Sequence, residues 1–307
     1  AYQTAYFKCH FPREYMAALL TSVLDNSDKV SGYIGECREC GIALLPPDIN
    51  RSADRFTVEE GGIRFGLVAI KNIGRGFIQA VMRERETGGD FTSLYDFCSR
   101  MNGSEMNKRA VENLIRSGAF DSMGARRSQL IKVYESVMDS VAAQQRENVE
   151  GQMDFFSMAA DNDEKSNSVK EIPLPDIPEY TPEELMTMEK ATTGLYLSGH
   201  PMDHYRDAVR KLHAPTIVSI IEDFSRENGP ERFTDGQRIT IAGVITSSKT
   251  KTTKNNSLMA YVMVEDDTAS MELLCFSRVL ETCGAYMKEN QAVVVKGRLS
   301  VRDEKAP

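Results

Sequence analysis

The stretch from Gly66 to Arg83, GLVAIKNIGRGFIQAVMR, constrains the fold of this chain more than any other part of it. An Ile-Gly-Arg-Gly turn separates two short segments whose apolar residues recur at helical spacing. The residues expected to face inward are Ile70, Ile73, Ile78 and Val81. The pattern therefore predicts two short helices joined by a tight hairpin.

The turn of this hairpin predicts a phosphate-binding site. Gly74 and Gly76 are expected to adopt backbone angles that other residues avoid, which lets amide groups approach a phosphate at the start of the second helix. Lys71 and Arg75 add positive charge beside Ile73 and these amides. Because every phosphate presents the same oxygens, such contacts hold DNA without reading its sequence. The five residues are candidate contacts to duplex DNA, and a tight corner without a ligand is the alternative.

Residues 91–118 contain a weaker second copy of this helix-hairpin-helix pattern, and such units normally occur in pairs. Met106, Asn107, Lys108 and Arg109 stand where the first copy has its glycine turn. The last three are candidate DNA contacts. The missing glycines weaken the expected grip on phosphate.

Length and charge limit the architecture. A chain of 307 residues exceeds the usual domain size of about 100 to 200 residues, which predicts two or three compact units. The net charge of −8 is uneven: residues 64–146 carry 13 Lys or Arg against 9 Asp or Glu, residues 147–190 carry 3 against 12, and residues 236–307 carry 10 against 8. Charges are screened beyond about 8 Å at physiological salt, so the central acidic segment is compatible with phosphate binding elsewhere.

Several simple features point to a cytoplasmic setting. The sequence has no apolar run near the roughly 20 residues that cross a bilayer and no signal-peptide core. Six cysteines in a chain of this length do not make a disulfide scaffold. The first residue is Ala1 and the last strand-like run stops at Pro307, so both ends are expected to be cut from a longer protein.

Helical spacing recurs through the N-terminal half of the chain. Residues 15–23 and 30–40 are predicted helices, and Arg126 to Glu147 reads as a longer amphipathic helix. Residues 148–180 are rich in Asp, Glu, Asn, Ser and Pro, which bury too little apolar surface to fold alone. This segment is expected to be largely an exposed linker.

The linker contains an aromatic motif, Gln152, Met153, Asp154, Phe155 and Phe156. Two adjacent phenylalanines in an acidic, solvated stretch have no local core, and exposed aromatic pairs commonly anchor a partner protein. The alternative is that both rings fold back onto the preceding helix. The motif predicts a site for protein recognition.

The C-terminal region reads as a small barrel. Strand-length runs occupy residues 237–246, 259–265, 271–276 and 292–301, and a helix fits between the third and fourth. The order β-β-β-α-β is the plan of the oligonucleotide/oligosaccharide-binding (OB) fold, with the fifth strand expected beyond the truncated end. The fold class is therefore α+β and multidomain, with a mostly helical N-terminal half followed by an OB-fold barrel.

The first loop of this barrel holds Lys249, Lys251 and Lys254 among Ser, Thr and Asn. In OB-folds this loop commonly borders a groove for single strands, where basic residues follow the backbone and aromatic residues stack on bases. Tyr261 and Phe276 are candidates for stacking, and a core position is equally compatible with each. A solvated hairpin tip is the alternative for the lysines.

Several strings in this order resemble the C-family replicative DNA polymerases of bacteria, the alpha subunits of DNA polymerase III. They are AYQTAYFKCHFPREYMAALLTSVLDNSDKV, LPPDINRS, GIRFGLVAIKNIGRG, NKRAVENLIRSGAFDSMG, GQMDFF and LYLSGHPMD. The likeness spans nearly all 307 residues. It implies the end of the fingers domain at 1–63, a tandem helix-hairpin-helix module at 64–146, a linker with a clamp-binding motif at 147–180, a helical connector at 181–235 and an OB-fold at 236–307.

The resemblance also implies partners and an activity. Residues 152–156 match an internal sliding-clamp-binding peptide, and duplex DNA, single-stranded template and other holoenzyme subunits are the further partners. Polymerases of this family extend a primer with two metal ions held by a palm domain, which would precede Ala1. We therefore assign no catalytic residue, cofactor or metal to this chain, place the magnesium ions in that palm domain, and expect the chain alone to be inactive.

Other chemistries fit the sequence less well. Cys37 and Cys40, with Cys9 and His10, could supply four zinc ligands, but structural zinc sites place paired cysteines in turns and this pair falls in a helical pattern. His200 lies in a Ser-Gly-His-Pro string, where a capped turn before a helix is favoured over nucleophilic catalysis. A non-catalytic single-strand-binding module and a protein scaffold remain alternative functions.

Overall fold

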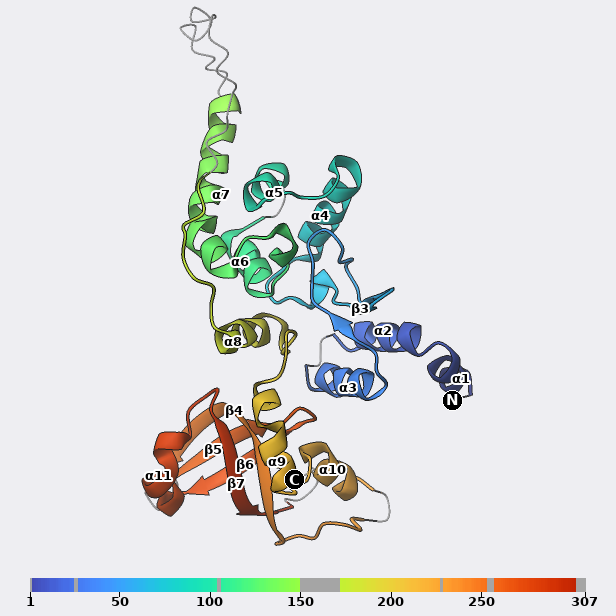
Figure 1. Ribbon diagram of the computed structural model, residues 1–307, viewed down its shortest axis with the longest axis vertical. Helices are drawn as coiled ribbons and strands as arrows, with labels where there is room; N and C mark the ends of the chain where they lie inside the picture. The colour runs from blue at the N-terminus through green and yellow to red at the C-terminus, as the bar shows by residue number, and fades with distance from the viewer. Residues whose placement is uncertain are drawn as a thin grey trace, which may run out of the picture. The chain divides into compact units, whose positions relative to one another are not determined.

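The computed structural model describes residues 2–24, 27–103, 106–149, 172–226, 229–252 and 257–301 (Figure 1). The chain divides into two compact units, one formed by residues 1–24 and 41–198 and the other by residues 25–40 and 199–307. Within the described ranges, no helix combines the length and hydropathy needed to cross a membrane.

The first unit opens with helices α1 (Tyr2–His10) and α2 (Pro12–Ser22) and a small sheet. Its strands are β1 (Leu44–Leu45), β2 (Thr57–Glu59) and β3 (Gly62–Arg64), in the order β1-β3-β2. β3 pairs in parallel with β1 and antiparallel with β2. Strands of two or three residues carry no readable alternation, so the prediction of helices alone for residues 1–63 was wrong here. The predicted helix at 15–23 is confirmed as α2.

Helices dominate the rest of the first unit. They are the 3-10 helices η1 (Leu67–Ala69) and η2 (Asp121–Met123) and the α-helices α4 (Arg75–Gly88), α5 (Leu94–Met101), α6 (Lys108–Arg116) and α7 (Arg127–Val149). The predicted helix before the glycine turn is only the single 3-10 turn η1. The predicted long helix is α7, and the second hairpin is α5 and α6.

A cluster of phenylalanines forms the centre of this helical module. The Phe97 ring lies edge-on to Phe77, Phe91 and Phe120, with ring centroids 6.2, 5.0 and 5.1 Å away, and all four side chains are buried. Edge-to-face pairs add to the apolar burial that holds helices together. The cluster therefore joins α4, α5 and the segment after α6 into one core.

Part of the expected linker is bound to α7. Residues 172–180 return along the start of that helix: Gln129 Nε2 donates to the Pro175 carbonyl at 2.8 Å, and the backbone amides of Arg127 and Ser128 donate to the Glu179 carboxylate at 2.8 and 3.0 Å. Helix α8 (Pro182–Thr193) follows, with a capping box at its start. None of residues 172–180 is buried, so the exposure predicted for this part of the linker is confirmed, but its hydrogen bonds to α7 were not predicted.

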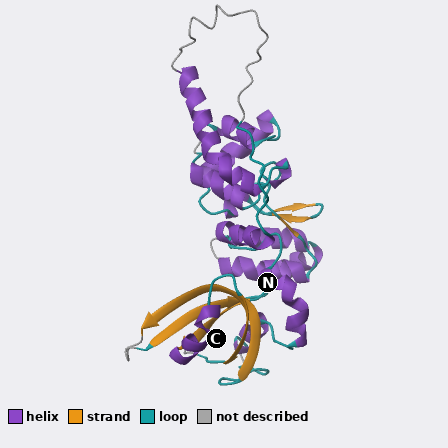
Figure 2. Cartoon of the chain, turned by 60° about the vertical axis from the view of Figure 1, so that its left-hand side comes forward, coloured by secondary structure: helices purple, strands orange, loops and turns teal. Residues whose placement is uncertain are grey.

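The second unit contains α3 (Ser27–Glu39), which confirms the helix predicted at 30–40, and a four-stranded antiparallel sheet (Figure 2). Before the sheet come η4 (Pro201–Tyr205), α9 (Arg206–Lys211) and α10 (Ile217–Phe224). The sheet and its helices are β4 (Arg238–Thr252), β5 (Leu258–Glu265), β6 (Ser270–Phe276), α11 (Ser277–Cys283), η5 (Gly284–Tyr286) and β7 (Ala292–Arg298), in strand order β6-β5-β4-β7. This curled sheet confirms the predicted β-β-β-α-β order and agrees with an OB-fold.

The sheet is packed on both faces at its centre. Ala260 and Val262 of β5 lie in a core that also contacts Leu280 of α11. Ala242 and Val244 of β4 lie in a separate cluster with Met202 of η4 and Val209 of α9. The connector before the barrel therefore covers part of the sheet, and the structure confirms that His200 caps η4 as a turn residue.

Candidate nucleic-acid interface

The first hairpin presents an open helix start. Helix α4 begins at Arg75 with Gly74 as its N-cap residue, and Gly74, Arg75 and Gly76 are all exposed. The first amides of a helix have no intrahelical acceptor, and glycine has no side chain with which to cap them. These amides and the positive end of the helix dipole suit an anionic oxygen.

The reason we gave for the glycines was wrong. Gly74 has φ −72° and ψ 145°, which any residue can adopt, and Gly76 lies inside α4 without a positive φ. The left-handed residue of the corner is Asn72, at φ 61°. Asparagine tolerates this conformation better than most residues, so it makes the turn without glycine. What Gly74 supplies is the lack of a side chain over the helix start.

Lys71 and Ile73 of the first hairpin have different surroundings. Lys71 is exposed, but its backbone amide donates to the Thr192 carbonyl at 2.9 Å and its ammonium donates to the Ala191 carbonyl at 3.0 Å. Asn113 of α6 donates to the Lys71 carbonyl at 2.6 Å. Ile73 is half-buried. A contact from either residue to DNA stays a prediction.

The second hairpin has a closed helix start. Asn107 is the N-cap residue of α6, and its side-chain oxygen accepts the Ala110 amide at 2.9 Å. The Lys108 ammonium lies 3.0 Å from the Asp139 carboxylate on α7, and Arg109 is exposed. One amide and one cation of this hairpin are thus already engaged within the protein. DNA binding by these three residues stays a prediction.

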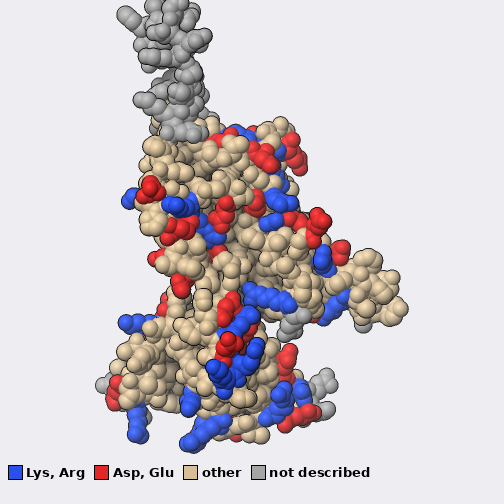
Figure 3. Space-filling view, viewed as in Figure 1, with Lys and Arg blue, Asp and Glu red and all other residues tan. Residues whose placement is uncertain are grey.

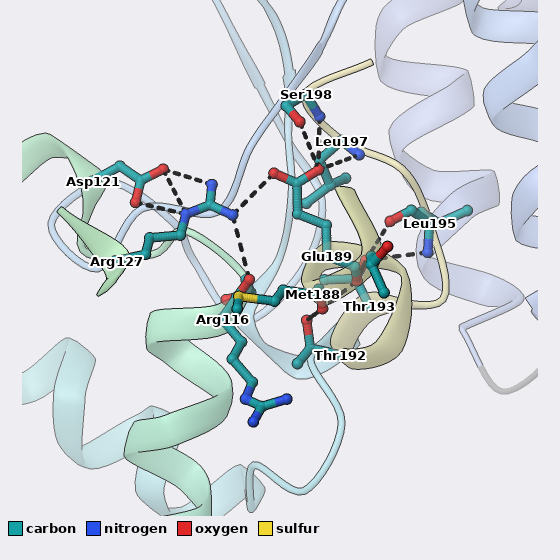
Figure 4. Close-up of polar contacts among 12 residues, drawn as sticks. Arg116, Asp121, Arg127, Met188, Glu189, Thr192, Thr193, Leu195, Leu197 and Ser198 are labelled. Carbon is teal, nitrogen blue, oxygen red and sulfur yellow. Dashed lines mark hydrogen bonds and ion pairs between the residues drawn. The ribbon is translucent and has the colours of Figure 1, made fainter. Parts of the chain in front are cut away.

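The sequence did not predict the buried ion pair between Arg127 and Glu189 (Figure 4). The Arg127 guanidinium on α7 lies 3.1 Å from the Glu189 carboxylate on α8, with side chains 7% and 1% exposed. Arg127 also pairs with Asp121 at 2.6 Å. The other Glu189 oxygen accepts the amides of Leu197 and Ser198, both at 2.9 Å.

The network favours the charged form of Arg127. Burial alone would lower the pKa of the Arg127 guanidinium, but Asp121 and Glu189 outweigh it and raise that pKa. Glu189 recurs three residues after buried Met186 and three before buried Thr192, so it occupies the inward face of α8. A carboxylate at an inward helical position was the only sequence signal of this pair.

The barrel brings its candidate residues onto one face. In the register of the sheet Lys249 lies opposite Tyr261, and Lys251 lies opposite Met259, which in turn lies opposite Phe276. Cross-strand partners share a face, so both lysines and both aromatic residues point away from the core that contains Ala260 and Val262. The Lys251 ammonium lies 5.2 Å from the Tyr261 ring centroid, and Phe276 is 62% exposed.

The structure corrects the predicted end of the first strand of the barrel. Lys249 and Lys251 lie within β4, which runs to Thr252, and are not in a loop as expected. Alternating Ser, Thr and Lys is polar enough to resemble a loop, but cross-strand pairing extends the strand through it. Lys254 lies outside the described residues, as do the clamp-binding candidates Gln152, Met153, Asp154, Phe155 and Phe156.

Two further properties of the described part of the chain are the distribution of its charged side chains and the placement of possible metal ligands. Figure 3 shows Lys and Arg interspersed with Asp and Glu over the visible face. No group of three or more His, Cys, Asp or Glu in the described part of the chain is placed to hold a metal ion. Burial raises the pKa of the Cys37 thiol to about 11, which disfavours the thiolate that zinc requires.

Two protein families match this chain, one over the hairpins and one over the barrel. A helix-hairpin-helix motif family matches residues 41–130, and a family of OB-fold nucleic acid binding domains matches residues 239–306. The exposed start of α4 lies in the first match, and the face with Lys249 and Tyr261 lies in the second.

Curated relatives match the chain almost from end to end. The DNA polymerase III subunit alpha of Saccharopolyspora erythraea is 37% identical, and those of Vibrio cholerae and Neisseria meningitidis serogroup B are 33% and 35% identical. Each match covers 99% of this chain and 25% of the relative. The chain therefore spans about a quarter of the length of the curated relatives it matches.

Proposed function

We propose that this chain, which is related along nearly its whole length to DNA polymerase III alpha subunits, is the part of such a polymerase that holds duplex DNA and the sliding clamp. The observation that carries the proposal is the start of α4, where Gly74 leaves helix amides open beside Arg75 in a region that matches the helix-hairpin-helix motif. A backbone phosphate is the DNA group that these amides fit.

The chemistry is sequence-independent positioning. Amide groups at the helix start donate to phosphate oxygens, and the Arg75 guanidinium adds a charge-assisted contact. Neither group reaches a base edge as part of this contact, so the duplex is held at any sequence. Each neutralised phosphate releases counterions, which makes the affinity fall steeply with salt.

The barrel is proposed to bind the single-stranded template. Lys249 and Lys251 on β4 would follow the phosphate backbone, and Tyr261 and Phe276 on the same face would stack on bases. Lys254 is proposed as a further phosphate contact. A non-catalytic single-strand-binding module is the second candidate function, and the shared face of these four described residues is what favours it.

The remaining parts of the proposal come from the relationship to the polymerases. Residues 152–156 are proposed to bind the sliding clamp through Phe155 and Phe156. The whole protein is proposed to extend primers by template-directed nucleotidyl transfer in the cytoplasm, together with other holoenzyme subunits. Its magnesium ions belong to a palm domain, and this chain alone is proposed to be inactive.

The test titrates the chain with primed duplex at several salt concentrations and, separately, with sliding clamp. We expect Arg75→Ala to weaken duplex binding and to reduce the slope of log affinity against log salt by about 0.9. Lys132→Ala, which removes an exposed positive charge from α7, is the matched control and should leave the slope unchanged. Duplex affinity that does not vary with salt would refute the DNA proposal.

The clamp arm uses a double variant, Phe155→Ala with Phe156→Ala. Burying two such rings in a partner stabilises the complex by about 1.5 to 3 kcal/mol each before the ordering cost, so the variant should abolish measurable clamp binding. Its duplex affinity should equal that of the wild type. Unchanged clamp affinity would contradict the assignment of residues 152–156, and oligonucleotide binding without clamp binding would favour the second candidate function.

A further inference from the structure

Lys71 was predicted to touch phosphate, but its amide, its carbonyl and its ammonium each make a hydrogen bond within the protein. The Lys71 amide donates to the Thr192 carbonyl, its ammonium donates to the Ala191 carbonyl, and its own carbonyl accepts the Asn113 side chain. We infer that Lys71 is a positioning residue, which fixes the first hairpin to the end of α8, and that it is not a ligand of DNA.

The two acceptors of Lys71 are carbonyls that a helix end leaves unsatisfied. Helix α8 ends at Thr193, and Gly194 follows at φ 81° with its amide bonded to the Lys190 carbonyl. The next two carbonyls, those of Ala191 and Thr192, are the ones that accept hydrogen bonds from Lys71. A cation at a helix C-terminus is also favoured by the helix dipole. Lys71 therefore completes the cap of α8.

Helix α8 is a firm support because its inner face carries the buried network. Glu189 pairs with Arg127 and also accepts two amides of the chain that follows α8. Breaking a buried pair of this kind is strongly unfavourable, so α8 is held in one place. Because Lys71 bonds the first hairpin to α8, the position of this hairpin is fixed as well.

The attachment lies directly beside the left-handed corner. Asn72, at φ 61°, immediately follows Lys71, and the open start of α4 is three residues beyond Asn72. A residue in this conformation persists where its neighbours over-determine it. The hydrogen bonds made by the backbone amide and the carbonyl of Lys71 fix the direction in which the chain enters the corner at Asn72. They thereby orient the first amides of α4.

This inference rests on the proposed duplex binding by the first hairpin, and its test separates the two. Lys71→Met keeps the stem and the backbone amide but removes the ammonium, Lys71→Arg restores a cation, and Arg75→Ala removes the proposed phosphate contact. Hydrogen exchange of the DNA-free chain is measured over residues 71–78 and 190–198. Duplex affinity is then measured across salt concentrations, at a temperature where each variant is folded.

We expect Lys71→Met to speed exchange in both segments and to weaken duplex binding about three- to tenfold, as the loss of one hydrogen bond would. The salt slope should stay at the wild-type value, and Lys71→Arg should restore both affinity and exchange. Arg75→Ala should lower the slope and leave exchange unchanged.

Three results would overturn the inference. The first is a Lys71→Met slope reduced by about 0.9 with unchanged exchange, which would make Lys71 a phosphate ligand. The second is faster exchange with wild-type affinity, which would give Lys71 a purely structural role. The third is unchanged exchange and affinity. If wild-type binding proved independent of salt, the proposed function would fail, while the exchange result would still report whether Lys71 holds the hairpin.

Discussion

The two hairpins of the first unit differ in whether a side chain accepts the first backbone amides of the second helix. Helix α4 begins after a glycine, so its first amides are open to solvent, whereas α6 begins after Asn107, whose side chain takes the Ala110 amide. Arg75 is exposed, while Lys108 pairs with Asp139. The same architecture therefore yields one helix start available to a ligand and one already satisfied by the protein.

The comparison teaches that a hairpin's shape and its capacity to bind phosphate are separable. Shape comes from the phenylalanine core and from the network behind the helices, which the two hairpins share. In the proposed function, the capacity to bind phosphate depends on the N-cap residue, because a capping side chain and a phosphate compete for the same donors.

The largest expected effect removes the shared support. Glu189→Gln should destabilise the first unit by about 3 kcal/mol, the low end for a broken buried pair, because Arg127 loses its buried carboxylate partner but keeps Asp121. Since Arg127 also donates to the Arg116 carbonyl at the end of α6, both hairpins should loosen. The chain has no tryptophan, so denaturation is followed by circular dichroism.

The matched control is Glu112→Gln, which breaks the more exposed ion pair between Glu112 and Arg116. Such pairs contribute about 0 to 1 kcal/mol, and this variant should unfold close to the wild type. Equal midpoints for the two variants would mean that the buried pair does not support the hairpins.

The next effect converts the open helix start into a closed one. Gly74→Asn places a capping side chain at φ −72° and ψ 145°, angles that suit an N-cap asparagine. We expect a few tenths of a kcal/mol more stability. The loss of one charge-assisted bond to phosphate, about 1.5 kcal/mol, should weaken duplex binding about tenfold. Gly74→Ala, which adds no acceptor, is the control, and equal duplex affinity of Gly74→Asn and wild type would contradict the role of the open amides.

A smaller effect tests the closed hairpin. Asn107→Ala should destabilise the first unit by about 1 kcal/mol, because the Ala110 amide loses its acceptor. Duplex affinity should not fall, because the change removes a competitor for the α6 amides and no proposed phosphate contact, and Asn107→Ser should restore stability by capping again. Should Asn107→Ala weaken duplex binding as strongly as Gly74→Asn, the second hairpin binds DNA as well and the contrast between the hairpins disappears.

Much of this fold follows from sequence because its signals are local. Apolar periodicity located α2, α3 and α7, and alternation located the four strands of the barrel. The small sheet of β1, β2 and β3 was missed, since its strands are too short for a period to show. Local patterns also failed at β4, whose polar end is a strand only because β5 pairs with it.

The candidate site was less predictable because its key contacts join distant residues. The sequence located the hairpin turn, but the partners of Lys71 on α8 lie about 120 residues away, and no spacing rule connects them. Arg127 and Glu189 are separated by 62 residues, and a carboxylate on an inward helical face was their only trace. The left-handed residue fell on Asn72 because turn chemistry allows asparagine as well as glycine.

The smallest effect concerns a third way of closing a helix start. Helix α7 is capped from a distance by Glu179, whose carboxylate accepts the Arg127 and Ser128 amides. Burial alone would raise the pKa of this carboxyl, but the bonds from Tyr180, Ser128 and Arg127 outweigh it and lower the pKa below its ordinary value. A depressed pKa stabilises the fold above the ordinary value, and that contribution is lost as pH falls through the lower one. Protection from hydrogen exchange over residues 172–180, measured against the intrinsic rate at each pH, should therefore fall on acidification below about pH 4. In Glu179→Gln this protection should be low already at pH 7 and lack the transition, and the same acid transition in both proteins would show that another carboxylate controls the segment.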